Sequence, residues 1–276
     1  MSGTLPPRLP APEAARLRGG RVIFVGGLLR RLAEALARMV GQPIGIGGYF
    51  DAQRAALEAQ GIATVELDVA SEGPIAANAA EIARAIAASP GPVTLVTHSK
   101  GSLDALAALI GDPSLAAPPR GVAAWISLQA PFYGSPLADL NARDPLVREL
   151  TGYLLRQGFG GSPEALLELR VSEREPYQRA NAPAIGELVR VVPTVCYGSY
   201  LIDEMRTLFR ITWLICKFEG QPLNDGLVGV PSAHLPDALQ VTEAGVDHAM
   251  AVIKVPGTGS FDPATCLTAL LSLALG

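Results

Sequence analysis

Three residues of this chain have the side-chain types that nucleophilic catalysis by a serine requires: Ser99, Asp225 and His248. A serine hydroxyl becomes a strong nucleophile when a histidine accepts its proton and a carboxylate holds that histidine in the correct tautomer. We expect each of the three at a strand end or in a loop, where a rigid scaffold commonly presents catalytic side chains. The pattern predicts Ser99 as the nucleophile, Asp225 as the orienting acid and His248 as the base.

The surroundings of Ser99 strengthen this prediction. An apolar run over 92–98 ends at the serine and an Ala- and Leu-rich helical pattern follows, so segment 97–101 (Thr-His-Ser-Lys-Gly) is predicted to be a strand, a sharp turn and the start of a helix. A serine nucleophile at such a turn needs small residues two positions away on either side, because the strand and helix backbones approach closely there. Gly101 meets this requirement and Thr97 departs from it. The competing interpretation is an ordinary serine N-cap.

The chain has three histidines, so the choice of base is narrow. His98 precedes the serine directly and is expected to point away from the hydroxyl across the turn. His234 follows Asp225 too soon for the helix that normally intervenes. His248 is the histidine that remains. Taken singly, the Asp-Gly pair at 225 also fits an ordinary tight turn, and His248 also fits an exposed residue near the C-terminus. The prediction therefore rests on the occurrence of the serine, the aspartate and the histidine together.

The elements that position these residues alternate between strands and helices. Apolar runs predict buried strands, and they occupy 21–25, 62–69, 92–98, 121–128 and 187–197. Helical patterns predict helices over 28–40, 49–60, 75–88 and 263–275. Strands that alternate with long helices indicate parallel βαβ units. The predicted fold class is α/β, with a mostly parallel central sheet and helices on both of its faces.

Residues 21–276 are predicted to form a single domain, because the composition of the chain shifts nowhere abruptly. Residues 1–20 carry four prolines and are expected to be a flexible arm. The strand and helix alternation breaks down over about 141–186, which we interpret as an insertion that forms a helical lid over Ser99. Apolar residues at helical spacing predict one apolar face within it: Leu146, Val147, Leu150, Leu154 and Leu155.

Composition excludes several kinds of partner. The net charge is −4, so nucleic-acid binding is not expected. No apolar run reaches the roughly 20 residues that a membrane-spanning helix needs. Residues 1–20 lack the apolar centre of a signal peptide, which predicts a cytoplasmic protein as written, or a secreted one if the chain is a processed form. The three cysteines indicate buried thiols, and a disulfide between Cys196 and Cys216 stays open.

Four segments resemble motifs of the bacterial triacylglycerol lipases in the α/β-hydrolase superfamily: 24–28 (Phe-Val-Gly-Gly-Leu), 97–101, 130–139 (Ala-Pro-Phe-Tyr-Gly-Ser-Pro-Leu-Ala-Asp) and 224–228 (Asn-Asp-Gly-Leu-Val). In that family the corresponding pieces look like V-H-G-L, G-H-S-x-G, T-P-H-x-G-S-x-x-A-D and N-D-G-x-V. The resemblance runs from Arg21 to about Val252. It implies the α/β-hydrolase fold and the same three catalytic residues. It also implies an oxyanion hole formed by the backbone N–H groups of Leu28 and Lys100.

The chain departs from the family pattern near each part of the implied site. Gly26 stands where the family has a histidine, Thr97 where it has a small residue, and Lys100 where Gln or Met is common. Met250 occupies the position of a calcium-binding Asp in the family. The resemblance therefore does not support calcium, and we expect no metal and no other cofactor.

These residues predict a serine hydrolase, a lipase or esterase, that cleaves carboxylic esters of lipid-like acids through an acyl-enzyme. The expected partner is a small-molecule or lipid ester, with transient contact to a lipid interface. Acyl transfer, thioester hydrolysis or polyester hydrolysis would use the same three residues. A non-catalytic binding protein with a hydrolase fold is the alternative from a different class, because Thr97 and Lys100 alter the turn around the serine.

Overall fold

A single six-stranded sheet forms the centre of the molecule, with the strand order β2-β1-β3-β4-β5-β6 and every neighbouring pair parallel. The computed structural model describes residues 8–28, 48–70, 72–145, 147–149, 163–202, 207, 209–254 and 261–276. The strands are β1 (Arg21–Val25), β2 (Thr64–Leu67), β3 (Val93–His98), β4 (Val122–Leu128), β5 (Thr194–Tyr200) and β6 (Leu239–Ala244). The prediction of a mostly parallel sheet is confirmed.

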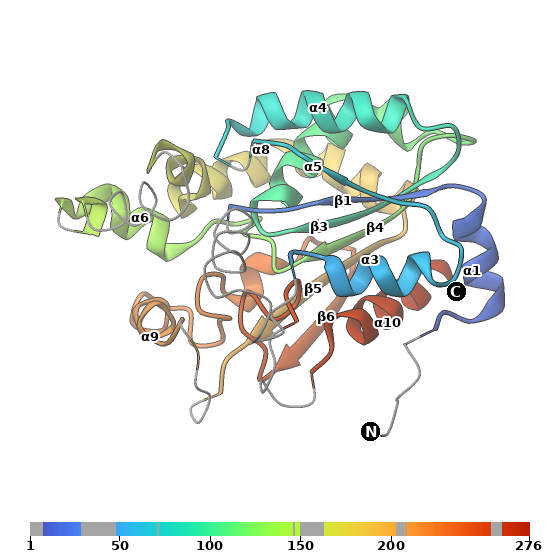
Figure 1. Ribbon diagram of the computed structural model, residues 1–276. Coiled ribbons are helices and arrows are strands. Elements are labelled where there is room, and N and C mark those ends of the chain that lie inside the picture. Colours follow the sequence, from blue (N-terminus) through green and yellow to red (C-terminus); the bar gives the residue numbers. More distant parts are fainter. Residues whose placement is uncertain are drawn as a thin grey trace, which may run out of the picture.

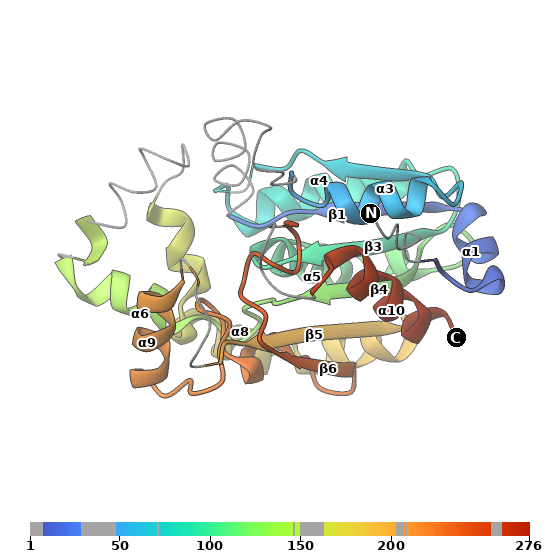
Figure 2. The same ribbon diagram turned by 60° about the horizontal axis from the view of Figure 1, so that its bottom comes forward.

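Helices cover both faces of the sheet, as Figure 1 shows. One face carries α4 (Ile75–Ala87), α5 (Lys100–Gly111) and α8 (Val171–Val191), and the other carries α1 (Ala11–Arg18), α3 (Asp51–Glu58) and α10 (Pro263–Leu275). The short helices α6 (Pro136–Arg143) and α9 (Arg210–Phe218) lie together beyond the carboxyl ends of the strands in both ribbon views (Figures 1 and 2). Three 3-10 turns complete the described elements: η2 (Pro113–Ala116), η4 (Pro163–Leu169) and η5 (Val230–Ala233).

The sheet separates two hydrophobic cores, because successive side chains of a strand point to opposite faces. In β1, Ile23 and Val25 pack with the helices of the α4 and α5 face, whereas Val22 and Phe24 pack with those of the α3 and α10 face. All four side chains are at most 1% exposed. A strand buried on both faces reads as a continuous apolar run, which is why the sequence predicted it.

The N-terminal arm was predicted wrongly in part. Residues 11–18 form α1, and the Ala14 and Leu17 side chains of this helix are buried against the sheet. The prolines at 10 and 12 lie before and within the first turn, where proline does not disrupt a helix. Residues 1–7 lie outside the described part of the chain.

The boundary of the predicted insertion is also wrong at its C-terminal end. Residues 171–186 belong to α8, whose Ile185 and Leu188 pack into the hydrophobic core on the α4 and α5 face of the sheet. In the sequence, Pro176 and Pro183 indicate the end of a helix. In the structure both lie inside α8, and the helix continues through them. The same error placed the beginning of β5 too early, at 187 instead of Thr194.

Other predicted elements lie outside the described residues. These are the remainder of the helix expected over 28–40 and the lid positions Leu146, Leu150, Leu154 and Leu155. None of the helices among the described residues is long and apolar enough to cross a membrane.

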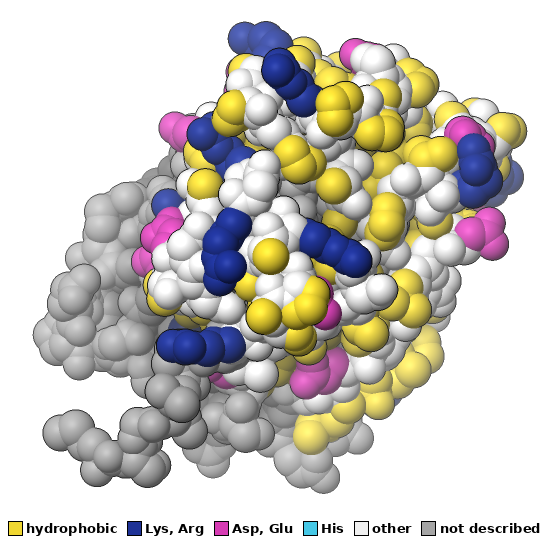
Figure 3. Space-filling view, turned by 90° about the vertical axis from the view of Figure 1, so that its right-hand side faces the viewer, with side chains coloured by type: hydrophobic (Ala, Val, Ile, Leu, Met, Phe, Trp, Pro, Cys, Tyr) yellow, Lys and Arg dark blue, Asp and Glu magenta, His cyan; other side chains and the backbone are white. Residues whose placement is uncertain are grey.

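The strands begin beside α1 and end beside α6 and α9 (Figure 1). Figure 3 views the end beside α1, where basic and acidic side chains are scattered among hydrophobic and uncharged ones. Ser99, Asp225 and His248 lie at the opposite end of the sheet, in loops that follow β3, α9 and β6.

Candidate active site

Ser99, Asp225 and His248 come from three separate loops. Ser99 lies between β3 and α5, Asp225 in the turn between α9 and η5, and His248 in the turn after β6. The carboxyl ends of parallel strands meet at one edge of the sheet, and in open α/β sheets this edge commonly holds the active site. The topology therefore brings residues distant in sequence to one place.

The three side chains form a continuous hydrogen-bonded line. His248 Nε2 lies 3.0 Å from Ser99 Oγ, and His248 Nδ1 lies 2.7 Å from Asp225 Oδ2. A carboxylate only accepts, so the Nδ1 of a neutral His248 carries the proton and its Nε2 is free to accept from the serine. All three residues are at least nine-tenths buried. The arrangement has the geometry of a nucleophile, a base and an orienting acid.

Ser99 has the strained backbone of a sharp strand-to-helix turn, with φ 53° and ψ −129°. Positive φ is rare for a residue with a side chain and commonly marks a functional constraint. Gly27 makes room for the turn, because a Cβ atom there would lie 2.7 Å from Ser99 Cβ. Gly101 is equally restricted by the backbone of β1 and of Gly26.

Asp225 is held in place from two sides. Its Oδ1 accepts from the backbone N–H groups of Leu227 and Val228, over 2.9 and 2.8 Å, which leaves Oδ2 for the histidine. Its backbone oxygen accepts from the N–H of His248 over 3.0 Å. The acid and the base are therefore joined through both side chain and backbone, which fixes the imidazole plane.

The turn that carries His248 is organised by the residue before it. Asp247 Oδ1 accepts from the N–H groups of Ala249 and Met250, each over 2.9 Å, and its Oδ2 accepts from the Thr207 hydroxyl over 2.7 Å. The carboxylate closes the turn locally, so Asp247 supports the backbone of His248 and does not compete for its ring.

The two unusual residues of segment 97–101 are accommodated by buried partners. The Thr97 hydroxyl accepts from Trp125 Nε1 over 2.9 Å and shares a hydrogen bond with the Ser102 hydroxyl. The Lys100 ammonium is fully buried and lies 2.9 Å from Asp104 Oδ1, one helical turn along α5. Burial raises the pKa of Asp104 to about 6, although Lys100 opposes this shift.

The expected oxyanion donors lie on either side of the serine. Lys100 follows Ser99 directly at the first turn of α5, and Leu28 follows Gly27, the residue packed against the serine side chain. Their backbone roles remain a prediction from the family resemblance.

The other two histidines take different positions. His98 is fully buried and contacts Tyr49, Gln129 and the backbone of His248, and no hydrogen bond joins it to Ser99. His234 is partly buried, and its Nε2 lies 3.3 Å from the backbone oxygen of Val241.

Tyr49 and Gln129 were not predicted to belong to the site. Tyr49 precedes α3, and Gln129 follows β4 with a positive φ of 49°. A short motif cannot reveal either residue, because each reaches the site from another part of the fold. The left-handed backbone of Gln129 has no sequence signal, since glutamine has no preference for it.

None of the three cysteines bonds to Ser99 or His248 in the described part of the chain. Cys196, Cys216 and Cys266 are free thiols, so the disulfide left open for Cys196 and Cys216 is not formed. Burial raises the pKa of each thiol to about 12. Met250 is buried, and no cluster of three or more metal-ligating side chains occurs among the described residues.

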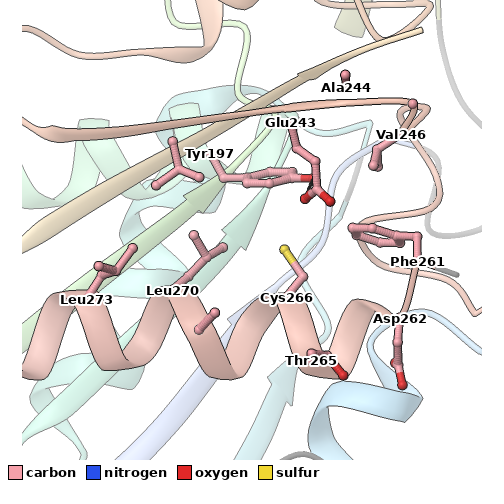
Figure 4. A pocket seen from close by; sticks show the side chains of 13 residues that line it. Tyr197, Glu243, Ala244, Val246, Phe261, Asp262, Thr265, Cys266, Leu270 and Leu273 are labelled. Atoms are coloured by element: carbon pink, nitrogen blue, oxygen red, sulfur yellow. Dashed lines mark hydrogen bonds between the residues drawn. The ribbon is translucent and has the colours of Figure 1, made fainter. Parts of the chain in front are cut away.

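A cavity of about 550 Å³ lies elsewhere, between β6 and α10. Figure 4 shows Cys266, Leu270 and Leu273 of α10 facing Tyr197 and Glu243 across it. None of the three proposed catalytic side chains lines this cavity, so it is not the place where the serine chemistry would occur.

Solved structures of esterases and lipases share this fold. A metagenomic carboxyl esterase matches with a TM-score of 0.69 at 24% identity, over 100% of this chain and 76% of the esterase. The mature form of a Bacillus licheniformis lipase matches with a TM-score of 0.62 at 21% identity, over 84% of this chain and 85% of the lipase. A Staphylococcus hyicus lipase matches with a TM-score of 0.58 at 13% identity, over 99% and 98% of the two chains.

The fold is therefore that of the lipase-like α/β-hydrolases, as the sequence resemblance implied. At these identities the likeness establishes the fold alone. No protein-family model matches the sequence, and no curated protein matches it significantly.

Proposed function

We propose that the protein is a serine hydrolase that cleaves carboxylic esters of lipid-like acids. The observation that carries this proposal is the hydrogen-bonded line from Ser99 Oγ through His248 to Asp225, with distances of 3.0 and 2.7 Å. The fold shared with carboxyl esterases and lipases supports ester hydrolysis as the reaction class.

The proposed reaction uses the three side chains in sequence. Ser99 Oγ attacks the ester carbonyl carbon while His248 Nε2 takes the hydroxyl proton, and Asp225 stabilises the imidazolium through the Nδ1 proton. The N–H groups of Leu28 and Lys100 stabilise the oxyanion. His248 then protonates the departing alcohol oxygen, which leaves an acyl-serine. Water, deprotonated by His248, then attacks the acyl carbon. The bond from this carbon to Ser99 Oγ breaks, the carboxylic acid leaves, and His248 returns the proton to the serine oxygen.

An exposed apolar face beside the site favours lipid-like esters and supports transient contact with a lipid surface. On α9, Ile211 is 73% exposed and Phe218 86% exposed, while Trp213 and Cys216 of the same helix are buried. This helix lies beyond the carboxyl ends of the strands in Figures 1 and 2. The Phe209 ring, directly before α9, contacts the His248 ring at a centroid distance of 6.4 Å. A helix with an exposed apolar face suits contact with lipid.

The test of the proposed function is covalent labelling together with turnover. The purified protein is treated with a fluorophosphonate, and hydrolysis is measured with p-nitrophenyl esters of graded chain length. We expect labelling at Ser99 and hydrolysis that increases with acyl length. Ser99→Ala abolishes both, with a loss of up to about 10⁶-fold in kcat where the three residues act as a unit.

Ser114→Ala is the matched control, because the hydroxyl of this η2 residue donates locally to Asp112, two residues earlier in the chain. Near-native turnover in Ser99→Ala, with labelling at another residue, would contradict the assignment. Absence of labelling in the wild type would favour the non-catalytic binding protein. Addition of an alcohol or a thioester to the same assay distinguishes acyl transfer and thioester hydrolysis from ester hydrolysis.

A further inference from the structure

A buried chain of hydrogen bonds runs beside Ser99 from one loop to another. The backbone N–H of Gly27 donates to the Tyr49 hydroxyl over 3.2 Å, and that hydroxyl bonds to Nδ1 of His98. On the other side of the imidazole, Nε2 of His98 lies 3.0 Å from the backbone oxygen of His248. Tyr49 is 3% exposed and His98 is fully buried, so water does not compete for these bonds.

The direction of each bond follows from Gln129, which also contacts Nε2 of His98. The amide nitrogen of Gln129 donates to Ser199 Oγ and to the backbone oxygen of Asp247, over 2.6 and 3.0 Å. A backbone oxygen only accepts, so the amide orientation is fixed and its Oε1 faces His98 at 3.1 Å as an acceptor. Both partners of Nε2 are therefore acceptors. Nε2 carries the proton, and Nδ1 accepts from the Tyr49 hydroxyl.

A neutral His98 completes the chain, since each group then donates and accepts in one consistent direction. Burial lowers the pKa of His98 well below its usual value, and the charge of a protonated His248 lowers it further. The two ring centroids are 4.7 Å apart. In the proposed reaction His248 becomes cationic when it takes the Ser99 proton. His98 stays neutral during that step and keeps its bonds.

We propose that Tyr49 and His98 are positioning residues that hold the two halves of the catalytic machinery in register. Tyr49 fixes the Gly27 peptide, which directly precedes the proposed oxyanion donor Leu28, and His98 fixes the backbone of His248. The inference rests on the proposed function, because it assigns how the oxyanion donor and the base keep their places on either side of the nucleophile. Such support matters because catalytic groups displaced by about 1 Å lose much of their effect.

Two substitutions break the central bond of this chain from opposite sides. Tyr49→Phe removes the hydroxyl, and His98→Gln keeps a donor toward His248 while it removes the Nδ1 acceptor. We expect each to lower kcat about tenfold, less than the roughly 10²- to 10³-fold loss on removing an oxyanion donor itself. KM should change by less than about twofold, because ground-state contacts with the ester are unchanged. The double variant should lose little more than either single variant, because both remove the same bond.

Tyr197→Phe is the matched control. Tyr197 is also fully buried, and its hydroxyl bonds to Glu243 over 2.9 Å, away from the proposed catalytic residues. This substitution removes the same group from the same hydrophobic core, so it should lower the Tm without lowering kcat. All rates are expressed per active site, titrated to completion with a p-nitrophenyl phosphonate, so that misfolded protein does not count.

The outcomes distinguish failure of the positioning role of Tyr49 and His98 from failure of the proposed hydrolase function. If kcat of Tyr49→Phe stays within about twofold of wild type, or if Tyr197→Phe loses as much, the positioning role is overturned. If the wild type neither hydrolyses esters nor reacts with the phosphonate, the proposed function fails instead. Imidazole ¹⁵N NMR of the chain's three histidines then decides the inference alone. A neutral His98 protonated at Nε2 and perturbed by Tyr49→Phe supports it, and a His98 protonated at Nδ1 overturns it.

Discussion

A Cβ atom at Gly101 would lie 2.6 Å from the backbone oxygen of Gly26, so α5 begins in direct contact with the end of β1. Neither backbone can move without displacing the serine turn. We therefore predict that Gly101→Ala lowers kcat/KM by at least about 100-fold and destabilises the fold by about 1–3 kcal/mol, as overpacking does. Ester turnover and urea unfolding measure the two effects.

Gly111→Ala is the control on the same helix, because nothing lies within 4 Å of a Cβ atom there. Alanine favours helix over glycine, so we expect wild-type turnover and an unfolding free energy equal to wild type or higher by up to about 1 kcal/mol. Full activity in Gly101→Ala would show that the close contact does not constrain the serine.

The buried Lys100 and Asp104 pair predicts unequal effects of removing its two members. Asp104→Asn leaves a fully buried ammonium without its carboxylate, which should lower the unfolding free energy by about 3–5 kcal/mol at pH 7. Lys100→Met leaves a carboxyl group that escapes its charge by protonation, because burial already raises its pKa to about 6. The loss in Lys100→Met should therefore be the smaller one.

The pH dependence gives a second measurement on the same variants. A pKa of about 6 in the folded state, above the value in the unfolded chain, means that Asp104 lowers the unfolding free energy as pH rises from about 4 to 6. Lys100 lowers that pKa, so the pKa of Asp104 should be higher in Lys100→Met. The unfolding free energy of this variant should therefore continue to fall above pH 6, by up to about 1.4 kcal/mol per pH unit. Urea unfolding of Lys100→Met between pH 5 and 8 tests this, and a loss independent of pH would contradict it.

The sequence predicted the parts of the fold whose physics is local. The continuous apolar runs of β1 and β3 identified buried parallel strands. The edge strand β6 was missed, because the polar residues Gln240, Thr242 and Glu243 interrupt any apolar run within it. The helix α8 was misread because Pro176 and Pro183 are breakers in isolation, whereas burial of its apolar side chains stabilises it in the fold.

The candidate site was also predicted only in part from the sequence. The choice of Ser99, Asp225 and His248 followed from the residue types that serine chemistry needs and from their chain order in the family that the sequence resembles. In the structure the His248 side chain lies within hydrogen-bond distance of both Ser99 and Asp225. The support given by Tyr49 and Gln129 could not be predicted. It depends on which loops the sheet order brings together, and neither residue type indicates such a role.

The exposed face of α9 predicts binding to lipid. We expect Ile211→Ser together with Phe218→Ser to weaken sedimentation with phosphatidylcholine and phosphatidylglycerol vesicles by at least about tenfold, since burial of even one large apolar side chain stabilises by about 1.5–3 kcal/mol. Hydrolysis of a short soluble ester should not change. Leu273→Ser is the control, because this residue is 54% exposed on α10, away from the carboxyl ends of the strands. Equal vesicle binding by all variants would exclude α9 as the lipid contact.

The identity of the base is the last prediction. His248 Nε2 lies 3.0 Å from Ser99 Oγ, whereas His234 bonds to the backbone oxygen of Val241 at the edge of the sheet. We therefore expect His248→Ala to abolish turnover and phosphonate labelling, with a loss in kcat comparable to that of Ser99→Ala, since residues of such a unit depend on each other. His234→Ala should keep turnover within about twofold of wild type, because no part of the proposed proton transfer involves its ring. Both variants are compared by kcat over pH 5–9 after circular dichroism has confirmed folding. A larger loss of kcat in His234→Ala than in His248→Ala would reverse the assignment of the base.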